Sequence, residues 1–330
     1  MQCAVIEKHG KEIENLVIQE REELVARGEN IRVRVTATAI NRADLLQRRG
    51  LYPAPPGAPQ DVPGLEFVGY VDQIGEEVTE WKGAEPVFGI VAGGSYADQL
   101  LTHQRLAVPV PAGMSDTDAA AIPEAFISAH DALVSQGGMK PGDLVLLHAV
   151  AGGIGSAALQ LVHQWGARAI GTAGSAEKLG KMAELAPLTA INYKEEDFQE
   201  RIQALFGPNA VDLILDTVGA DYWQKNLAVL KTCGRLILFG IMSGVSAETS
   251  LATILAKRLR IIGTTLRGRP LEEKILATQA FAHQVIPLLE QGKLNPVIDS
   301  VFPFDQLHEA TGRMERNENT GKIVLTFDGA

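Results

Sequence analysis

Apolar and polar residues alternate along the first third of the chain. From Ile31 to Ala39 apolar side chains occupy every second position, and Arg or Thr fills the positions between them. This is the period of a strand with one face in water. Similar short segments follow at 67–74, 86–91 and 96–101, separated by Gly, Pro and Asp turns. We expect this region to form a small antiparallel β barrel.

A second pattern begins at Leu144, where short apolar runs alternate with stretches of helical period. The run 144–147 is typical of a strand buried on both faces. The predicted strands are 144–147, 169–172, 190–192, 213–216, 236–239 and 261–264, and the predicted helices are 156–165, 176–186, 195–206, 221–230 and 249–258. This succession predicts a doubly wound parallel α/β sheet.

Two changes of pattern suggest where the domains meet. Pro109-Val110-Pro111 precedes a predicted helix at 124–134, and beyond Arg269 the chain predicts a helix at 271–291, a strand at 297–302, a helix at 305–315 and a strand at 323–327. The 330 residues exceed the roughly 250–300 at which one core stops growing. We expect the last segment to return to the first domain, which leaves the parallel-sheet domain inserted and a cleft between the two.

The first predicted parallel strand runs into a glycine-rich turn, Ala149 to Gly155, which reads A-x-x-G-x-x-G. Val150 stands where the strict dinucleotide fingerprint has its first glycine. Gly152 and Gly153 let a pyrophosphate approach the backbone, and Gly155 lets the helix pack close to the strand. Taken alone, the turn also fits a strand-to-helix connection that binds no nucleotide, but six strands in succession favour a dinucleotide site.

The residues at the end of the second parallel strand indicate which dinucleotide the chain binds, NADH or NADPH. NADH sites normally carry Asp or Glu there, but this tip reads Thr-Ala-Gly-Ser from 172 to 175, and Lys178 lies one turn further on. Ser175 and Lys178 would form charge-assisted bonds with a 2′-phosphate, which favours NADPH. The alternative is that Ser175 only caps the following helix and Lys178 is solvated; we expect the cap in either case.

Composition narrows the class of protein. The formal net charge of −10 and the 5% of aromatic residues disfavour nucleic acids and anionic membranes as partners. The first residues have no basic start and no apolar core, and no apolar run approaches about 18 residues. We therefore expect a cytoplasmic enzyme. A non-enzymatic nucleotide- or RNA-binding module remains the alternative from another class, with the basic cluster 257–260 as its candidate surface.

Several blocks spread over nearly the whole chain resemble one family. They are 41–50 with Tyr52, 55–57, 62–66, the glycine turn, 175–178, Asn192-Tyr193 and Gly321-Lys322. The chain is similar to the zinc-independent NADPH:quinone oxidoreductases of the medium-chain dehydrogenase/reductase superfamily, of the tumour-suppressor-inducible and zeta-crystallin-like type. This resemblance implies a chaperonin-10-like catalytic domain at 1–123 plus 267–330, a Rossmann NADP-binding domain at 124–266, and homodimers joined at their sheet edges.

The resemblance also implies the site residues. Asn41, Asp44 and Tyr52 are the candidate catalytic residues. The candidate NADPH-binding residues are Ser128, Ala151, Gly152, Gly153, Ile154, Gly155, Gly174, Ser175, Lys178, Tyr193, Thr217, Phe239, Gly240 and Ile241. Asn41 and Tyr52 would orient the acceptor carbonyl, and solvent or Tyr52 would supply the proton. A strand-terminal role for Asn41 and a helix-capping role for Asp44 are alternatives.

Zinc-dependent relatives carry a Cys and a G-H-E motif in the first domain. In this chain Asn41 lies near the Cys position, Leu65 stands between Gly64 and Glu66, and there are two cysteines in all. We therefore expect no metal site, which disfavours alcohol oxidation because an alkoxide needs a Lewis acid. Quinones and activated enones accept hydride without one, and the sequence does not separate these two acceptor classes.

Overall fold

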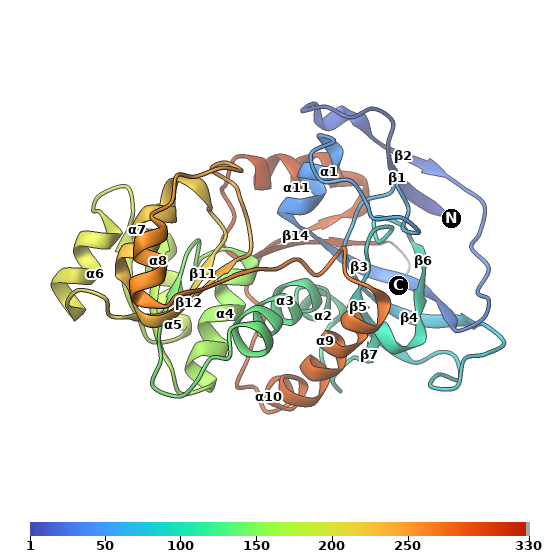
Figure 1. The fold of residues 1–330 in the computed structure, drawn as a ribbon. Coiled ribbons are helices and arrows are strands. Elements are labelled where there is room, and N and C mark those ends of the chain that lie inside the picture. Colours follow the sequence, from blue (N-terminus) through green and yellow to red (C-terminus); the bar gives the residue numbers. More distant parts are fainter. Residues whose placement is uncertain (328–330) are drawn as a thin grey trace. The chain divides into compact units, whose positions relative to one another are not determined.

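The computed structural model describes residues 1–327, which form two compact units (Figure 1). The first unit contains Met1–Ile127 and the chain from Leu266 onward, and the second unit contains Ser128–Thr265. The family resemblance implies the corresponding changes at 123/124 and 266/267. Each unit has its own sheet and its own buried core.

The first unit is built on antiparallel strands. They are β1 (Gln2–Ile6), β2 (Leu16–Glu20), β3 (Asn30–Ile40), β4 (Glu66–Ile74), β5 (Pro86–Ile90), β6 (Gln99–His103), β7 (Ala107–Pro109), β14 (Ile298–Pro303) and β15 (Lys322–Thr326). β1 pairs with β2, and the others form one sheet in the order β14-β15-β3-β4-β5-β7, with β6 paired to β3. In this unit, within residues 1–327, β14 and β15 run parallel to each other and the other strand pairs are antiparallel.

Strand β3 organises this sheet because it has partners along both edges. β4 pairs with one edge, while β6 pairs with the first half of the other edge and β15 with its second half. The alternating apolar residues of β3 face the core, where Ile31, Val33 and Val35 are buried. The C-terminal strands therefore complete the sheet that β3 begins, which brings Lys322 next to the end of β3.

Three strands of the first unit were not predicted, and β6 begins later than predicted. β1, β2 and β7 are short, and β6 starts at Gln99 rather than at 96. Tyr96 and Ala97 are buried but lie in a bend: the Tyr96 amide donates to the Pro63 carbonyl at 3.0 Å, and Ala97 forms an isolated bridge with Cys3. Apolar character alone does not distinguish such a bend from a strand.

The helices of the first unit surround this sheet. They are α1 (Arg42–Arg48), α2 (Asp116–Ala120), α9 (Leu271–Gln284), α10 (Ile286–Glu290) and α11 (Leu307–Glu315), with short 3₁₀ turns η1 (Ile13–Asn15), η2 (Gln104–Leu106) and η6 (Phe304–Gln306). The prediction of one helix at 271–291 is wrong, because α9 ends before Val285 and Pro287 lies in the first turn of α10. Proline lacks the N–H that a continuing helix requires.

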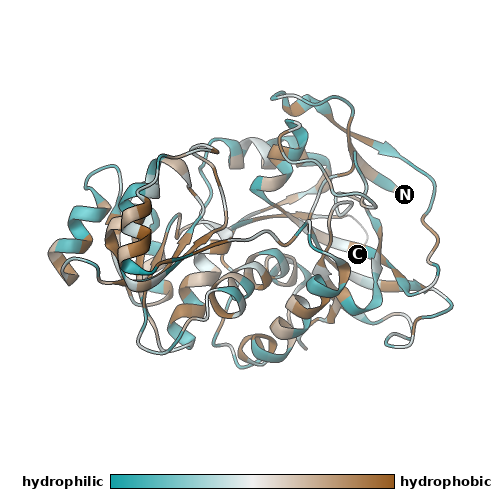
Figure 2. Cartoon of the chain, in the orientation of Figure 1, coloured by the Kyte–Doolittle hydropathy of each residue, from teal (hydrophilic) through white to brown (hydrophobic). Residues whose placement is uncertain are grey.

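The second unit confirms the predicted doubly wound sheet. Its strands are β8 (Leu144–Leu147), β9 (Arg168–Ala173), β10 (Leu188–Asn192), β11 (Val211–Asp216), β12 (Leu230–Leu238) and β13 (Arg260–Gly263), all parallel, in the order β10-β9-β8-β11-β12-β13. Figure 2 shows hydrophobic residues concentrated along these strands. The strand order reverses at β8, and ligands of such sheets bind beyond the carboxyl ends of the strands at that point.

The helices of the second unit connect these parallel strands. They are α3 (Ser128–His130), α4 (Gly153–Gln164), α5 (Ala176–Leu185), α6 (Phe198–Phe206), α7 (Trp223–Val229) and α8 (Leu251–Lys257), with η4 (Asp131–Gln136) and η5 (Ala220–Tyr222). The helix predicted at 124–134 is mostly π-helical, in η3 (Pro123–Ile127) and η4, with α3 between them. π-helical turns are rare and recur at functional sites.

Two features of the helices bear on possible partners. Within residues 1–327 no helix is long and apolar enough to cross a membrane. In the basic cluster 257–260, the Lys257 ammonium donates to the carbonyl oxygens of Leu227, Ala228 and Leu230 at 2.7–2.9 Å. These carbonyls lie at the C-terminal end of α7, so Lys257 serves the fold at this point.

Candidate active site and cofactor site

Asp44 closes the connection between β3 and α1. Its carboxylate accepts hydrogen bonds from the Asn41 amide at 2.8 Å, the Gly64 amide at 3.1 Å and the Tyr96 hydroxyl at 3.0 Å. Burial raises the pKa of Asp44 to about 6, although these three hydrogen bonds oppose the rise. Both carboxylate oxygens are engaged inside the first unit, so the capping contact is visible, while a catalytic role for Asp44 stays a prediction.

Asn41 belongs to a cluster with Glu66 and Lys322. The Lys322 ammonium donates to Asn41 Oδ1 and to Glu66 Oε1, each at 2.6 Å, and Asn41 Nδ2 donates to Glu66 Oε1 at 2.8 Å. The Glu66 side chain is fully buried, and that of Lys322 is 4% exposed. A buried ion pair of this kind depends on complete hydrogen bonding, which the Asn41 amide helps to provide.

The cluster restricts what Asn41 can do. Asn41 Nδ2 also donates to the Ala39 carbonyl at 3.2 Å, so both amide N–H bonds are already used within the first unit. An acceptor carbonyl would have to replace one of these partners. The role of Asn41 in orienting such a carbonyl therefore stays a prediction, while its strand-terminal structural role is visible in these contacts.

Arg267 fixes the proline-rich segment that carries Tyr52. Its guanidinium lies 5.1 Å from the centre of the Tyr52 ring and donates to the carbonyl oxygens of Tyr52 at 3.2 Å and Ala92 at 2.7 Å. It also donates to Gln47 Oε1 at 2.6 Å. Burial raises the pKa of the Tyr52 hydroxyl, which therefore stays protonated as a hydrogen-bond donor. Arg267 could not be singled out from the sequence, because no local pattern ties it to residues more than 170 positions earlier.

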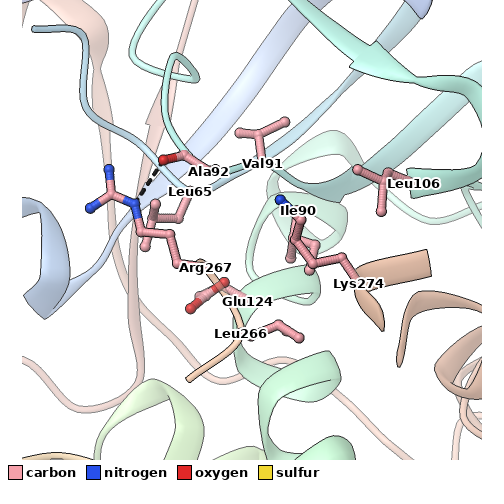
Figure 3. A pocket seen from close by; sticks show the side chains of 9 residues that line it. All are labelled: Leu65, Ile90, Val91, Ala92, Leu106, Glu124, Leu266, Arg267 and Lys274. Carbon is pink, nitrogen blue, oxygen red and sulfur yellow. Dashed lines mark hydrogen bonds between the residues drawn. The ribbon is translucent and has the colours of Figure 1, made fainter. Parts of the chain in front are cut away.

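Glu124 is a second residue that the sequence did not single out for a site. It lies in η3, and its backbone amide donates to Glu66 Oε2 at 2.9 Å. Its carboxyl group lines a cavity with Arg267 and Lys274 (Figure 3). Asn41, Glu66, Lys322 and Glu124 thus form one polar group inside the first unit.

In the second unit, the glycine turn accommodates Val150 by a compensating contact. Ala149 takes the left-handed backbone conformation with φ 52°, and the Val150 side chain is fully buried. A Cβ on Gly171 would lie 2.9 Å from Val150 Cγ1, so the absence of a side chain on β9 makes room for Val150. The A-x-x-G-x-x-G version of the turn is therefore sterically consistent.

The beginning of α4 is open to an anion. Gly152 is the N-cap of this helix, no side chain caps it, and no acidic residue lies in its first turn. A Cβ on Gly152 would meet only the Ala149 carbonyl, at an ordinary 3.4 Å, so the protein itself does not require glycine there. Ala151, Gly153 and Ile154 complete this turn. Free N–H groups and space above Gly152 fit a pyrophosphate.

The predicted adenosine-end residues lie together beyond β9 and β10. Ser175 caps α5, as expected, because its hydroxyl accepts from the Lys178 amide at 3.3 Å. The Tyr193 hydroxyl lies 2.6 Å from the position that a Cβ on Gly174 would occupy. Glu177 is paired with Lys181 at 2.9 Å. Lys194, whose Cε lies 3.2 Å from the same Cβ position, is a further candidate that the sequence did not single out.

The ends of β11 and β12 provide the other predicted cofactor residues. Phe239 and Gly240 donate their amides to the Asp216 carbonyl at 2.8 and 3.1 Å, and Ile241 is exposed. Among residues 1–327, no group hydrogen-bonds the buried hydroxyls of Ser128 and Thr217. Buried hydroxyls normally have a partner. Two orphaned hydroxyls at predicted cofactor positions fit a ligand that supplies the missing hydrogen bonds.

Comparisons with known proteins agree with this architecture. Residues 27–112 match the alcohol dehydrogenase GroES-like domain, and residues 153–282 match the zinc-binding dehydrogenase family. The crystal structure of Escherichia coli quinone oxidoreductase complexed with NADPH has a TM-score of 0.90 and 28% identity, covering 99% of this chain and 100% of that one. The chain belongs to the medium-chain dehydrogenase/reductase superfamily and is similar to its quinone reductases.

Two further relatives carry other names. A synaptic vesicle membrane protein VAT-1 homolog of Danio rerio is 31% identical over 313 residues, which cover 90% of this chain but 64% of the homolog. The JamJ enoyl reductase structure has a TM-score of 0.86 and 25% identity, covering 99% of each chain. The predicted fold, a Rossmann domain inserted in a GroES-like domain, is thereby confirmed. Such a Rossmann domain binds a nicotinamide dinucleotide.

The donor set around Asn41 differs from a zinc site. Leu65, between Gly64 and Glu66, is a buried apolar residue, and the Lys322 ammonium is bonded to Glu66. Within the described chain, residues 1–327, no three His, Cys, Asp or Glu side chains are grouped as a metal would require. A cationic lysine at the shared carboxylate competes with any divalent cation there.

Proposed function

We propose that this protein is an NADPH-dependent reductase of quinones that transfers hydride directly to its acceptor without a metal ion. The Asn41–Glu66–Lys322 cluster carries this proposal. Its positive charge comes from a lysine that is bonded to Asn41 and Glu66 in the first unit. A chain with this donor set suits an acceptor that takes hydride without a Lewis acid, and quinones are such acceptors. The likeness to a quinone oxidoreductase supports the same acceptor class.

The described residues would have distinct roles in this reaction. The bound nicotinamide supplies the hydride. The α4 N-terminus with Gly152 and Gly155 binds the pyrophosphate, and Ser128 and Thr217 donate or accept hydrogen bonds that the fold leaves unmade. Tyr52 orients the acceptor carbonyl from its place beside Arg267. Orientation of this kind reduces the entropic part of the barrier.

Reduction of α,β-unsaturated ketones and aldehydes is the second candidate, because the fold also resembles an enoyl reductase. NADPH consumption at equal protein concentration, with a panel of benzo- and naphthoquinones against a panel of enones and enals, separates the two. We expect faster turnover of the quinones. Fast enone turnover with idle quinones contradicts the quinone proposal, and turnover of neither panel contradicts both.

Replacement of Lys178 by Ala tests the choice of NADPH over NADH. We expect NADPH binding to weaken by about 1–3 kcal/mol, the contribution of a charge-assisted hydrogen bond to the 2′-phosphate, and NADH binding to stay unchanged. The measurement is the Kd of each cofactor by calorimetry. Lys181→Ala is the matched control, because Lys181 lies on the same helix and pairs with Glu177. An equal loss for both cofactors shows that Lys178 does not bind the phosphate.

We also propose a homodimer joined through the β13 edge and α8. β13 is the last strand of its sheet, and in the segment that precedes it in the chain Val245, Leu251 and Leu255 are 83%, 73% and 80% exposed. Several large apolar side chains that are exposed in one short segment suit an interface. Leu255→Asp should give a folded monomer in light scattering, whereas Leu276→Asp, at a 65% exposed leucine of α9, should stay dimeric. A wild-type chain that is monomeric at micromolar concentration contradicts this proposal.

A further inference from the structure

A small internal cavity lies beside the Asn41–Glu66–Lys322 cluster. Its volume is about 20 Å³, which is room for one water molecule. Most of the lining is apolar, including Leu65, Ile90 and Leu106. Three ionisable side chains interrupt this lining (Figure 3). They are Glu124 of η3, Lys274 of α9, and Arg267, which precedes α9. All of these residues belong to the first unit.

Glu124 has an unusual position within this lining. The turn that carries it is π-helical and is anchored by the bond from the Glu124 amide to Glu66. η3 packs against β4, β5 and α9, so these elements enclose the carboxyl group of Glu124. An enclosed, mainly apolar cavity stabilises the neutral, protonated form of a carboxyl group relative to the carboxylate.

The charges around Glu124 act in both directions. Burial, and then the Glu66 carboxylate, raise the pKa of Glu124 to about 8, and the cations Lys322 and Arg267 oppose this rise. The ionisable groups that face it or share its cavity are Glu66, Asp44, Tyr52, Lys322, Arg267 and Lys274. Glu124 is therefore protonated at neutral pH and loses its proton in mildly basic solution.

We infer that Glu124 is the acid that delivers the proton accompanying hydride transfer, and that the one-water cavity returns a proton to it from the side of Lys274. This inference rests on the proposed reductase function and adds a named proton donor to it. A hydrogen-bond donor next to the Asn41 cluster meets a need that Asn41 itself does not meet, because both of its N–H bonds are used. General acids of this type contribute about 10²–10⁴-fold to a rate.

The step balances as follows for a quinone. The acceptor gains two electrons and one hydrogen nucleus as hydride from NADPH, which becomes NADP⁺, and one acceptor oxygen is left as an anion. The O–H bond of Glu124 breaks, and its proton forms the new O–H bond of the hydroquinone. Glu124 is left as a carboxylate and regains a proton through the cavity water, which takes one from the Lys274 ammonium as it gives one up. The neutral Lys274 amine then takes a proton from solvent.

Lys274 suits the return of the proton. Its side chain lies among the lining residues (Figure 3). Lys274 is only half-buried, so it is open to solvent as well as to the cavity. Burial lowers the pKa of the Lys274 ammonium, which makes it a better proton donor than an exposed lysine. An amine, a water and a carboxyl group around one cavity can pass a proton in sequence.

The first experiment measures the proton on Glu124 without any turnover. Thermal unfolding of the cofactor-free protein is recorded from pH 6 to pH 9 for the wild type, Glu124→Gln and the surface control Glu272→Gln. In the folded protein Glu124 keeps a proton that the unfolded chain loses at the same pH. The free energy of unfolding of the wild type therefore falls as the pH rises toward about 8. We expect the Tm of Glu124→Gln to gain on the wild type as the pH rises. A constant difference overturns the inference.

The second experiment measures proton delivery. In Glu124→Gln we expect kcat for an alkylated quinone to fall about 10²-fold or more, and the decline of activity above about pH 8 to disappear. With an electron-poor halogenated quinone, whose reduced anion is stable, the kcat of Glu124→Gln should fall much less. Glu124→Asp keeps a carboxylic acid, so its activity should still decline in basic solution. The Kd for NADPH should be unchanged in both variants.

These outcomes separate the inference from the function on which it rests. If the wild type reduces quinones and Glu124→Gln does so equally well with the same pH profile, Glu124 is not the donor while the reductase function stands. If the wild type reduces neither quinones nor enones, the proposed function and the inference both fail, whatever the pH dependence of stability. A uniform loss with both quinones and an unchanged profile shows a structural role and also overturns the inference.

Discussion

Lys322→Met is expected to destabilise the first unit by about 3–5 kcal/mol and to abolish quinone reduction. The substitution leaves the fully buried Glu66 carboxylate without its cation, and an uncompensated buried charge costs about this much. It also removes the donor to Asn41 Oδ1, so the Asn41 side-chain amide keeps only its two donated hydrogen bonds and is held less firmly. Urea unfolding measures the first effect, and NADPH oxidation with a quinone measures the second.

Two controls show whether the lysine acts through Glu66. Lys322→Met combined with Glu66→Gln removes both charges, so it should recover much of the lost stability but not the activity. Lys181→Met breaks an exposed pair with Glu177 and should change stability by only about 0.3–0.5 kcal/mol. A Lys322→Met variant that unfolds like the wild type would show that the buried pair does not stabilise the first unit.

The strands of the second unit were predictable because each is an apolar run that ends at a turn. β12 is the instructive exception, since it begins at Leu230 and not at 236. Its first half is largely exposed, its pairing with β11 changes register, and Cys233 has φ 61°. An exposed, bulged half-strand has no apolar period, so a hydrophobic pattern does not reveal it.

The candidate site was predictable in part. The turn residues of the cofactor site are local in sequence, and Ser175 and Lys178 follow directly from the end of β9. The polar cluster of the first unit is different, because Lys322 reaches Asn41 across 281 positions and Glu66 across 256. The pairing of β3 with β15 on one edge and with β4 on the other brings these residues together. Glu124 is the first residue of the predicted helix 124–134. A glutamate at the start of a helix is ordinary, so its position in the sequence does not indicate a site.

The departure at Val150 shows the same limit within one motif. In the sequence, Val150 weakens the glycine fingerprint, because the strict motif demands glycine there. The structure shows that the compensating residue is Gly171, on the neighbouring strand β9, and that Ala149 takes the left-handed conformation. A motif written along the chain cannot include a contact between two strands.

Gly155→Ala and Gly152→Ala form a matched pair that separates the fold of the turn from its ligand. A Cβ on Gly155 would lie 2.3 Å from the Ala149 carbonyl oxygen and 2.6 Å from Val150 Cα. Both atoms are backbone, so the turn itself must shift. We expect Gly155→Ala to cost about 1–3 kcal/mol or more of unfolding free energy, the usual range for overpacking. Chemical denaturation of the cofactor-free protein measures this cost.

Gly152→Ala should do the opposite. Its nearest neighbour would be the Ala149 carbonyl at 3.4 Å, and its φ of −81° suits any residue, so unfolding should change by less than about 1 kcal/mol. The new methyl group would occupy the space above the α4 N-terminus, where we propose that the pyrophosphate binds. NADPH affinity should therefore fall roughly tenfold or more, about 1.4 kcal/mol. Unchanged affinity in Gly152→Ala would show that the dinucleotide does not approach this turn, because the fold alone tolerates the added atom.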